Sequence, residues 1–161
     1  MLPHIKIRNE LRPGDIGYIV YLHGALYAKE QGWNYTFEAY VAGPLAEFVK
    51  SSGKRQRIWI VEQEEQVVGS IAIVEASEQE AQLRWLLLHP KLRGQGIGKT
   101  LMEEAIRFSH ENHYRSIFLW TVSALTTAAN LYKSVGFQLT EERTVKLWGA
   151  TVTEQRYDLI L

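Results

Sequence analysis

Cysteine is absent from the 161-residue chain. Its absence excludes a disulfide framework, a thiolate metal site and a cysteine nucleophile, and it fits a reducing compartment. The chain also lacks an apolar run of about 18 residues, the minimum that a membrane-spanning helix needs. Its polar beginning, MLPHIKIRNELRPGD, has no apolar core of a signal peptide. We therefore expect a cytoplasmic protein with no membrane partner and no bound metal.

The chain also has no excess of positive or of negative charge. Lysine and arginine number 18, aspartate and glutamate number 18, and the formal net charge is +0. A dedicated nucleic-acid-binding domain usually carries a basic face, so we expect no nucleic-acid partner. Hydrophobic residues make up 46% and charged residues 22%, an ordinary globular balance. The length is typical of one domain, and we expect residues 1–161 to form it.

The pattern of apolar residues predicts an α/β domain with a largely antiparallel sheet. The predicted strands cover residues 4–9, 57–75 as two strands joined near Glu64-Glu65, 81–90, 116–122, 137–145 and 154–161. The predicted helices run from about 15 to 29, from 36 to about 50, from 97 to 112 and from 125 to 136. Because proline removes a backbone donor, Gly43-Pro44 predicts a kink or a break in the second helix. The run Leu86-Leu87-Leu88 predicts a strand end that is buried on both faces.

The stretch RGQGIGKT, residues 93–100, is typical of a phosphate-binding turn. A P-loop would require glycine where the chain has Arg93, and a Rossmann turn would require a small residue where it has Lys99. The turn follows a strand and opens a helix, so it gathers free backbone N–H groups at the positive end of a helix dipole. A diphosphate group would fit there.

Two motifs in sequence order carry a resemblance to a known family. Residues 93–98 match the pattern [QR]-x-x-G-x-[GA], and ANLYKSVGF follows about thirty residues later. Together they resemble the GCN5-related N-acetyltransferase (GNAT) superfamily over residues 55–160. The resemblance implies a mixed, mostly antiparallel sheet of about seven strands flanked by about four helices. It also implies transfer of an acetyl group from acetyl-CoA, as co-substrate, to an amine of a small molecule or protein.

The segment LRPGDIGYIVYLHGALYAKEQGWNYTFEAYV is similar to the acetyltransferase half of bacterial proteins that fuse a MarR-type regulator to such a domain. The chain carries no DNA-binding half of that kind, and the similarity names no substrate. A homodimer is expected from the family alone, because the final strands of related proteins often pair between subunits.

The resemblance also assigns roles to residues. Backbone groups of Leu86, Leu87 and Leu88 would pair with the pantetheine arm like an added strand, and one N–H there would stabilise the oxyanion. Tyr132 would be the general acid that protonates the leaving thiolate. The pyrophosphate would be held by the turn, which comprises Arg93, Gly94, Gln95, Gly96, Ile97, Gly98 and Lys99.

Two features leave alternatives open. The general base is unassigned, because the position where relatives often have glutamate is Gln82, and Glu80 and a bound water are the other candidates. Leu125 stands where many relatives have an asparagine that touches the cofactor. These departures keep a catalytically weak acyl-CoA-binding module as the alternative function.

The residues expected to bind the acceptor amine are inferred from composition alone. Aromatic and acidic residues cluster in the first two predicted helices: Tyr27, Trp33, Tyr35 and Tyr40, with Glu30 and Glu38. They either receive an amine through cation–π and ionic contacts or pack the core. Trp85 and Trp120 likewise either line the acceptor cleft or pack the core. His110 and His113 favour the end of a helix dipole over a metal site.

Overall fold

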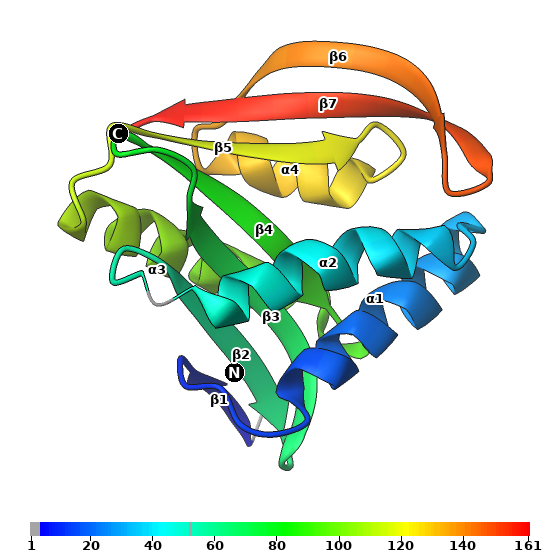
Figure 1. Cartoon of the computed structure of the whole chain (residues 1–161), viewed down its shortest axis with the longest axis horizontal. Helices are drawn as coiled ribbons and strands as arrows, with labels where there is room; N and C mark the ends of the chain where they lie inside the picture. Colours follow the sequence, from blue (N-terminus) through cyan, green and yellow to red (C-terminus); the bar gives the residue numbers. More distant parts are fainter. Residues whose placement is uncertain (1–3, 52) are drawn as a thin grey trace.

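The seven strands form one sheet with helices on both of its faces (Figure 1). A computed structural model describes residues 4–51 and 53–161. The strand order is β1-β2-β3-β4-β5-β7-β6, and all neighbours are antiparallel except the parallel pair β4 and β5. The elements in chain order are β1 (Ile5–Arg8), α1 (Asp15–Gln31), α2 (Thr36–Lys50), β2 (Arg57–Gln63), β3 (Gln66–Glu75), β4 (Glu80–Leu88), η1 (Pro90–Leu92), α3 (Ile97–Glu111), β5 (Ser116–Val122), α4 (Thr126–Ser134), β6 (Gln138–Leu147) and β7 (Ala150–Ile160). The predicted fold class is confirmed.

Each face of the sheet has its own hydrophobic core. Helices α1 and α2 cover one face with buried side chains that include Ile19, Val41 and Leu45. Helices α3 and α4 cover the other with residues such as Leu101 and Met102. Fully burying a side chain of this size stabilises the fold by about 1.5–3 kcal/mol, so the two cores fix the helices against the sheet.

Arg8 binds two carboxylates and so connects β1 to both α1 and β2. The guanidinium of Arg8 on β1 donates to both carboxylate oxygens of Asp15 at 2.7 and 2.8 Å. Its Nε lies 2.9 Å from the carboxylate of Glu62 on β2. Burial alone would raise the pKa of Asp15, but the hydrogen bonds from Arg8 and from the backbone of Arg12 outweigh it and lower the pKa. Asp15 is the first residue of α1, which begins where the sequence predicts a helix.

Of the kink or break predicted at Pro44, the break is wrong, because α2 is one continuous helix from Thr36 to Lys50. A proline inside a helix costs about 3 kcal/mol. Val41, Leu45 and Phe48 are buried on the sheet around it, and this packing outweighs the lost hydrogen bond.

The last two strands pair as predicted, but they are longer than the sequence indicates. They form one hairpin in which Leu147 pairs with Ala150 across the two-residue turn Trp148-Gly149. Both turn residues have positive φ, 55° and 78°, as a type I′ turn requires. Strand β6 ends two residues beyond the predicted 137–145 and β7 begins four residues before the predicted 154–161, so the prediction missed the residues on both sides of the turn.

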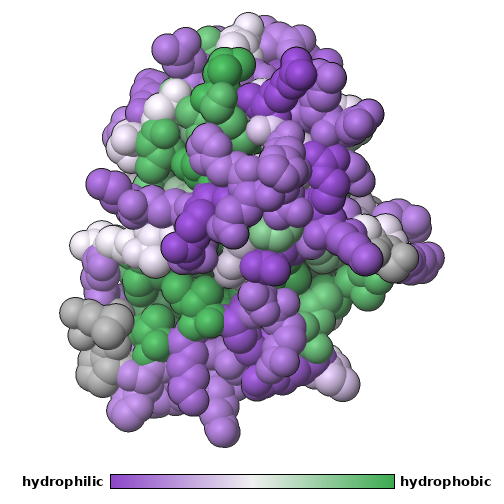
Figure 2. All heavy atoms as spheres, turned by 90° about the vertical axis from the view of Figure 1, so that its left-hand side faces the viewer, coloured by the Kyte–Doolittle hydropathy of each residue, from purple (hydrophilic) through white to green (hydrophobic). Residues whose placement is uncertain are grey.

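The surface is mainly polar on the side shown in Figure 2, where hydrophilic residues are interrupted by apolar areas. The large exposed apolar residues in the molecule include Ile160, 81% exposed, and Leu139, 45% exposed, both on the final hairpin. Within the described residues, no helix has the length and apolar character to cross a membrane.

Candidate active site

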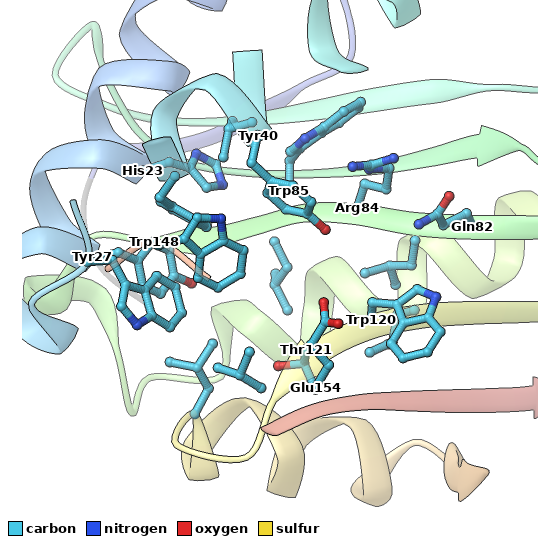
Figure 3. Close-up of a pocket in the computed structure, with 18 of the residues that line it drawn as sticks. His23, Tyr27, Tyr40, Gln82, Arg84, Trp85, Trp120, Thr121, Trp148 and Glu154 are labelled. Carbon is cyan, nitrogen blue, oxygen red and sulfur yellow. The ribbon is translucent and has the colours of Figure 1, made fainter. Parts of the chain in front are cut away.

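A pocket opens where β4 and β5 separate. The two strands pair only at Glu80–Gln82 with Ser116–Phe118 in the described part of the chain, and they diverge beyond that point. Helices α1 and α2 and the tip of the β6–β7 hairpin close the space around the opening (Figure 3). The lining residues include His23, Tyr27, Trp33, Phe37, Tyr40, Gln82, Arg84, Trp85, Leu86, Trp120, Thr121, Leu125, Tyr132, Trp148 and Glu154.

A β-bulge in β4 lies at the pocket wall. Ser70 pairs with Leu87 and Ala72 pairs with Arg84, so Ile71 alone faces two residues of β4. Trp85 in the bulge has a positive φ of 52°, which is uncommon for a residue with a side chain. The Ser70 hydroxyl donates to the Trp85 carbonyl at 2.7 Å and so holds the bulge. Bulges often redirect groups toward active sites, and sequence reasoning missed this one.

The leucine run is covered on both faces, as predicted, although only Leu87 is fully buried. Leu87 is 2% exposed and belongs to the core under α1 and α2. Leu86 and Leu88 are half-buried and pack against the opposite core. The run is apolar because the strand alternates between two covered faces. Its backbone edge toward β5 has no strand partner in the pairing register, which leaves this edge open to an added strand.

The glycine turn has the geometry of an anion site. Gly94 and Gly96 have φ of 77° and 82°, a region that glycine occupies without strain. Gly96 precedes α3 with no side-chain cap. Among the described residues, the backbone N–H groups from Gly94 to Lys99 have no intramolecular acceptor, whereas the N–H of Thr100 already bonds to Gly96. A Cβ on Gly98 would lie 3.1 Å from Leu131, so this glycine lets α3 pack closely on α4.

Arg93 is engaged by the protein itself. Its guanidinium donates to both carboxylate oxygens of Glu30 at 2.6 and 3.1 Å, and its Nε donates to the carbonyl of Leu88 at 3.2 Å. These bonds tie the glycine turn to α1 and to the end of β4. The side chain therefore orders the turn, and its positive charge is shared with Glu30. Gln95 likewise donates to a carbonyl of η1, that of Lys91.

Tyr132 lines the pocket. It is 6% exposed and packs beside Phe137 and Tyr157, with ring centroids at 6.2 and 5.9 Å. Burial, and then the proximity of Tyr27 and Tyr157, raise the pKa of its phenol. Tyr132 thus keeps its proton throughout the neutral range. Leu125, at the position that departs from the family pattern, also lines the pocket.

Aromatic rings from three elements surround the outer part of the pocket. The Trp148 ring at the hairpin tip lies 4.6 Å from Trp33, 4.9 Å from Phe37 and 5.3 Å from Tyr40. The carbonyl of Trp148 accepts a hydrogen bond from the backbone of Asn34 at 2.9 Å. Sequence reasoning missed Trp148, because the contact joins segments far apart in the chain.

The acidic and aromatic residues predicted for the acceptor side divide into two groups. Tyr27, Trp33 and Tyr40 line the pocket. Tyr35 is 81% exposed and Glu30 is bound to Arg93. Glu38 is also exposed, on α2. Trp85 and Trp120 both line the pocket.

Polar groups on β4 and β7 face the pocket from opposite sides (Figure 3). Arg84 and Gln82 lie on β4, and Glu154 lies on β7. Glu80, considered as a base, is instead bound to Arg156 at 3.2 Å and does not line the pocket. Sequence reasoning did not identify Arg84 and Glu154 as site residues. Strand alternation alone does not show which polar side chains lie beside the gap where β4 and β5 diverge.

The comparisons with known proteins agree with this geometry. A family model described as "Acetyltransferase (GNAT) domain" matches residues 54–139. Human N-acetyltransferase 8B is 31% identical over 99 residues, which is 58% of this chain and 44% of that protein. An uncharacterised N-acetyltransferase of Schizosaccharomyces pombe is 31% identical over 118 residues, covering 71% of this chain and 72% of that protein. The chain thus spans less than half the length of the human relative.

Solved structures show the same fold. An acetyltransferase from Streptococcus agalactiae aligns over 99% of this chain and 100% of its own, with a TM-score of 0.79 and 21% identity. A putative acetyltransferase from Salmonella typhimurium, solved with acetyl-CoA, aligns over 98% of this chain and 94% of its own, with a TM-score of 0.78 and 15% identity. The chain belongs to the GNAT acetyltransferase domain family.

Proposed function

We propose that this domain transfers an acetyl group from acetyl-CoA to an amine by direct attack on the thioester. The observation that carries the proposal is one continuous arrangement: a turn of unpaired N–H groups at the start of α3, next to an unpaired edge of β4. The pyrophosphate fits the turn, and the pantetheine arm fits the edge. The Salmonella typhimurium neighbour, solved with acetyl-CoA, supports this choice of ligand.

The residues of the chain supply four functions in this scheme. Backbone N–H groups from Gly94 to Lys99 hold the diphosphate. Backbone groups of Leu86 to Leu88 position the thioester arm, and an N–H at the adjoining bulge stabilises the oxyanion, an interaction typically worth about 10²–10³ in rate. Tyr132 protonates the departing thiolate. The burial that raises the pKa of Tyr132 also raises that of a thiolate beside it, so the proton transfer stays feasible.

The first test is ligand-dependent thermal unfolding with acetyl-CoA, ATP and NAD in parallel. A ligand present at 100 times its Kd adds about 2.7 kcal/mol to the free energy of unfolding. We expect a rise in Tm with acetyl-CoA alone. A rise with ATP and none with acetyl-CoA would exclude the proposal and support a nucleotide-binding turn instead.

The second test distinguishes an enzyme from a binding module. Thiol release from acetyl-CoA is followed in the presence of a panel of small amines and of peptide N-termini. Acetyl-CoA binding together with amine-dependent thiol release supports the enzyme. Binding without release from any amine supports the alternative, a regulatory acyl-CoA-binding module. The similarity to MarR-fused domains, the cytoplasmic location and the homodimer stay predictions, the last to be checked by light scattering.

A further inference from the structure

We propose that the acceptor is an α-amino acid with an apolar or aromatic side chain, bound through its carboxylate by Arg84 and through its amino group by Glu154. This inference rests on the proposed function and names the substrate class of the same pocket. It follows from the placement of Arg84 on β4 and of Glu154 on β7, with β5 between the two strands.

Arg84 is the cation that lacks a partner. It lies on β4 in the pocket and is half-buried, and among residues 4–51 and 53–161 its guanidinium has no ion pair and no hydrogen-bond acceptor. Its guanidinium carbon lies 5.1 Å from the centroid of the Trp85 ring, which is a cation–π contact. Burial lowers the pKa of Arg84, while the nearby Tyr40 acts in the opposite direction. A guanidinium desolvated to this degree favours an anion, and its planar fork suits a carboxylate.

The other arginines around the active site already have carboxylate partners. Arg93 is bound to Glu30. Arg143, which stacks over Trp120 at 5.2 Å, is bound to Glu154 at 2.9 Å. Arg84 is therefore the group that an incoming carboxylate would neutralise.

Glu154 is the carboxylate that lines the same pocket within the described part of the chain. It lies on β7 opposite Val122 of β5, and its side chain is 12% exposed. Arg143, which is 63% exposed, holds one of its oxygens from the outside. The second oxygen is available to an ammonium group. Because β5 lies between β4 and β7 in the sheet, Arg84 and Glu154 approach a ligand from different sides.

The rest of the lining fits the remainder of such a molecule. Tyr40, Trp85 and Trp120 supply apolar surface for a side chain. Thr121 also lines the pocket, and its hydroxyl oxygen Oγ1 is buried without a hydrogen-bond partner among the described residues. An amine without a carboxylate would leave Arg84 unpaired and would add a second cation beside it, which is unfavourable in a poorly solvated pocket. A peptide N-terminus has the same defect.

The proposed roles give a balanced reaction. The carboxylate of Glu154 takes one proton from the bound ammonium and releases it to solvent. The neutral nitrogen attacks the thioester carbonyl, and the carbon–sulfur bond breaks as the tetrahedral intermediate collapses. The thiolate takes the proton of Tyr132, and the second nitrogen proton restores that phenol. The products are the N-acetylated amino acid, coenzyme A and one proton.

The experiment compares amino acids with their decarboxylated analogues. The pairs are phenylalanine with phenethylamine, leucine with isoamylamine, and tryptophan with tryptamine. Acetylation is followed by thiol release, and binding is measured separately by calorimetry in the presence of coenzyme A. We expect kcat/KM for the preferred amino acid to exceed that for its analogue by at least tenfold. Equal or faster acetylation of the amine in every pair, or preference for a peptide N-terminus, would overturn the inference.

Variants assign the preference to Arg84. Arg84→Met should lower kcat/KM for the amino acid by about 10- to 100-fold, the range expected for a charge-assisted hydrogen bond. It should change the value for the matching amine by less than threefold and leave the Kd of acetyl-CoA unchanged. Arg84→Lys should restore part of the loss. Arg115→Met removes an exposed arginine far from the pocket lining and serves as the control. An Arg84→Met enzyme that still prefers the amino acid refutes the role.

Glu154 is checked by its pH dependence. Glu154→Gln should lower kcat and bind the amino acid more weakly in calorimetry, and its remaining activity should rise with pH in step with the fraction of free amine. An unchanged pH profile would refute the proton-accepting role. The experiments distinguish the two proposals. If acetyl-CoA produces no thermal shift, the proposed function is wrong. If acetyl-CoA binds but the domain acetylates only amines that lack a carboxylate, the substrate class is wrong and the proposed function stands.

Discussion

At the scale of single residues, Tyr132 offers the sharpest test of the chemistry. Tyr132→Phe removes the proton that the thiolate needs and keeps the ring in its buried position. We expect kcat to fall by about 10²–10⁴, the usual contribution of a general acid, with little change in the Kd of acetyl-CoA. The measurement is thiol release under saturating acetyl-CoA.

The neighbouring tyrosine provides the control. Tyr157 is 1% exposed, packs 5.9 Å from the Tyr132 ring and does not line the pocket. Tyr157→Phe should therefore retain kcat within a few-fold. If both variants lose activity equally, the effect is structural and Tyr132 has no special role.

Residues that act through local sequence could be predicted, and those that act through the fold could not. The glycine turn and Tyr132 stand in short motifs, so spacing alone marked them. Arg84 and Glu154 are separated by most of the C-terminal half of the chain, and only the splay of β4 from β5 brings them to one pocket. Because Gln82 stands where relatives often have glutamate, Glu80 was a candidate for the general base. The structure shows that Glu80 is bound to Arg156 instead.

At the scale of elements, the start of α3 links backbone conformation to binding. Gly96 has φ of 82°, and a Cβ there would meet no atom within 4 Å, so substitution acts through backbone strain alone. Gly96→Ala should lower the free energy of unfolding by about 1–2 kcal/mol. It should also reduce the rise in Tm that acetyl-CoA produces, because the turn can no longer present its N–H groups in the same arrangement.

Gly17→Ala is the matched control, in the first turn of α1, where a Cβ would also meet nothing within 4 Å. Alanine in a helix restricts the unfolded chain, so this variant should stabilise the domain by about 0.4–1 kcal/mol and leave the acetyl-CoA shift intact. A Gly96→Ala protein with an undiminished shift would show that the turn does not hold the ligand.

The elements themselves were predictable where apolar spacing is strong. Helices α1 and α3 and strands β2 to β5 follow from the pattern of buried residues. The continuity of α2 through Pro44 and the bulge at Trp85 do not, because both depend on tertiary contacts that outweigh local preference. The prediction missed the residues of β6 and β7 next to their turn, where burial does not alternate regularly.

At the scale of the whole molecule, His23 couples stability to pH. It is 4% exposed, and its Nδ1 lies 2.8 Å from the carbonyl oxygen of Ile19. Burial lowers its pKa from 6.5 to about 4 in the folded state, and the hydrogen bond to Ile19 opposes this shift only in part. The unfolded chain therefore binds a proton between these two pKa values that the folded chain does not. By linkage, stability is fully present above pH 6.5 and falls as the pH drops toward 4.

The expected loss follows from the two pKa values: lowering the pH from about 7.5 to 5 should reduce the free energy of unfolding by about 2 kcal/mol through His23 alone. Asp15, whose pKa is lowered, loses its contribution only below about pH 4, so it lies outside this window. Urea unfolding at both pH values measures the difference. His23→Met should remove most of the loss, whereas His110→Met, on the exposed end of α3, should retain it. Equal losses in wild type and His23→Met would show that His23 is protonated in the folded state, and that the interior between α1 and the pocket is more accessible to water than its packing indicates.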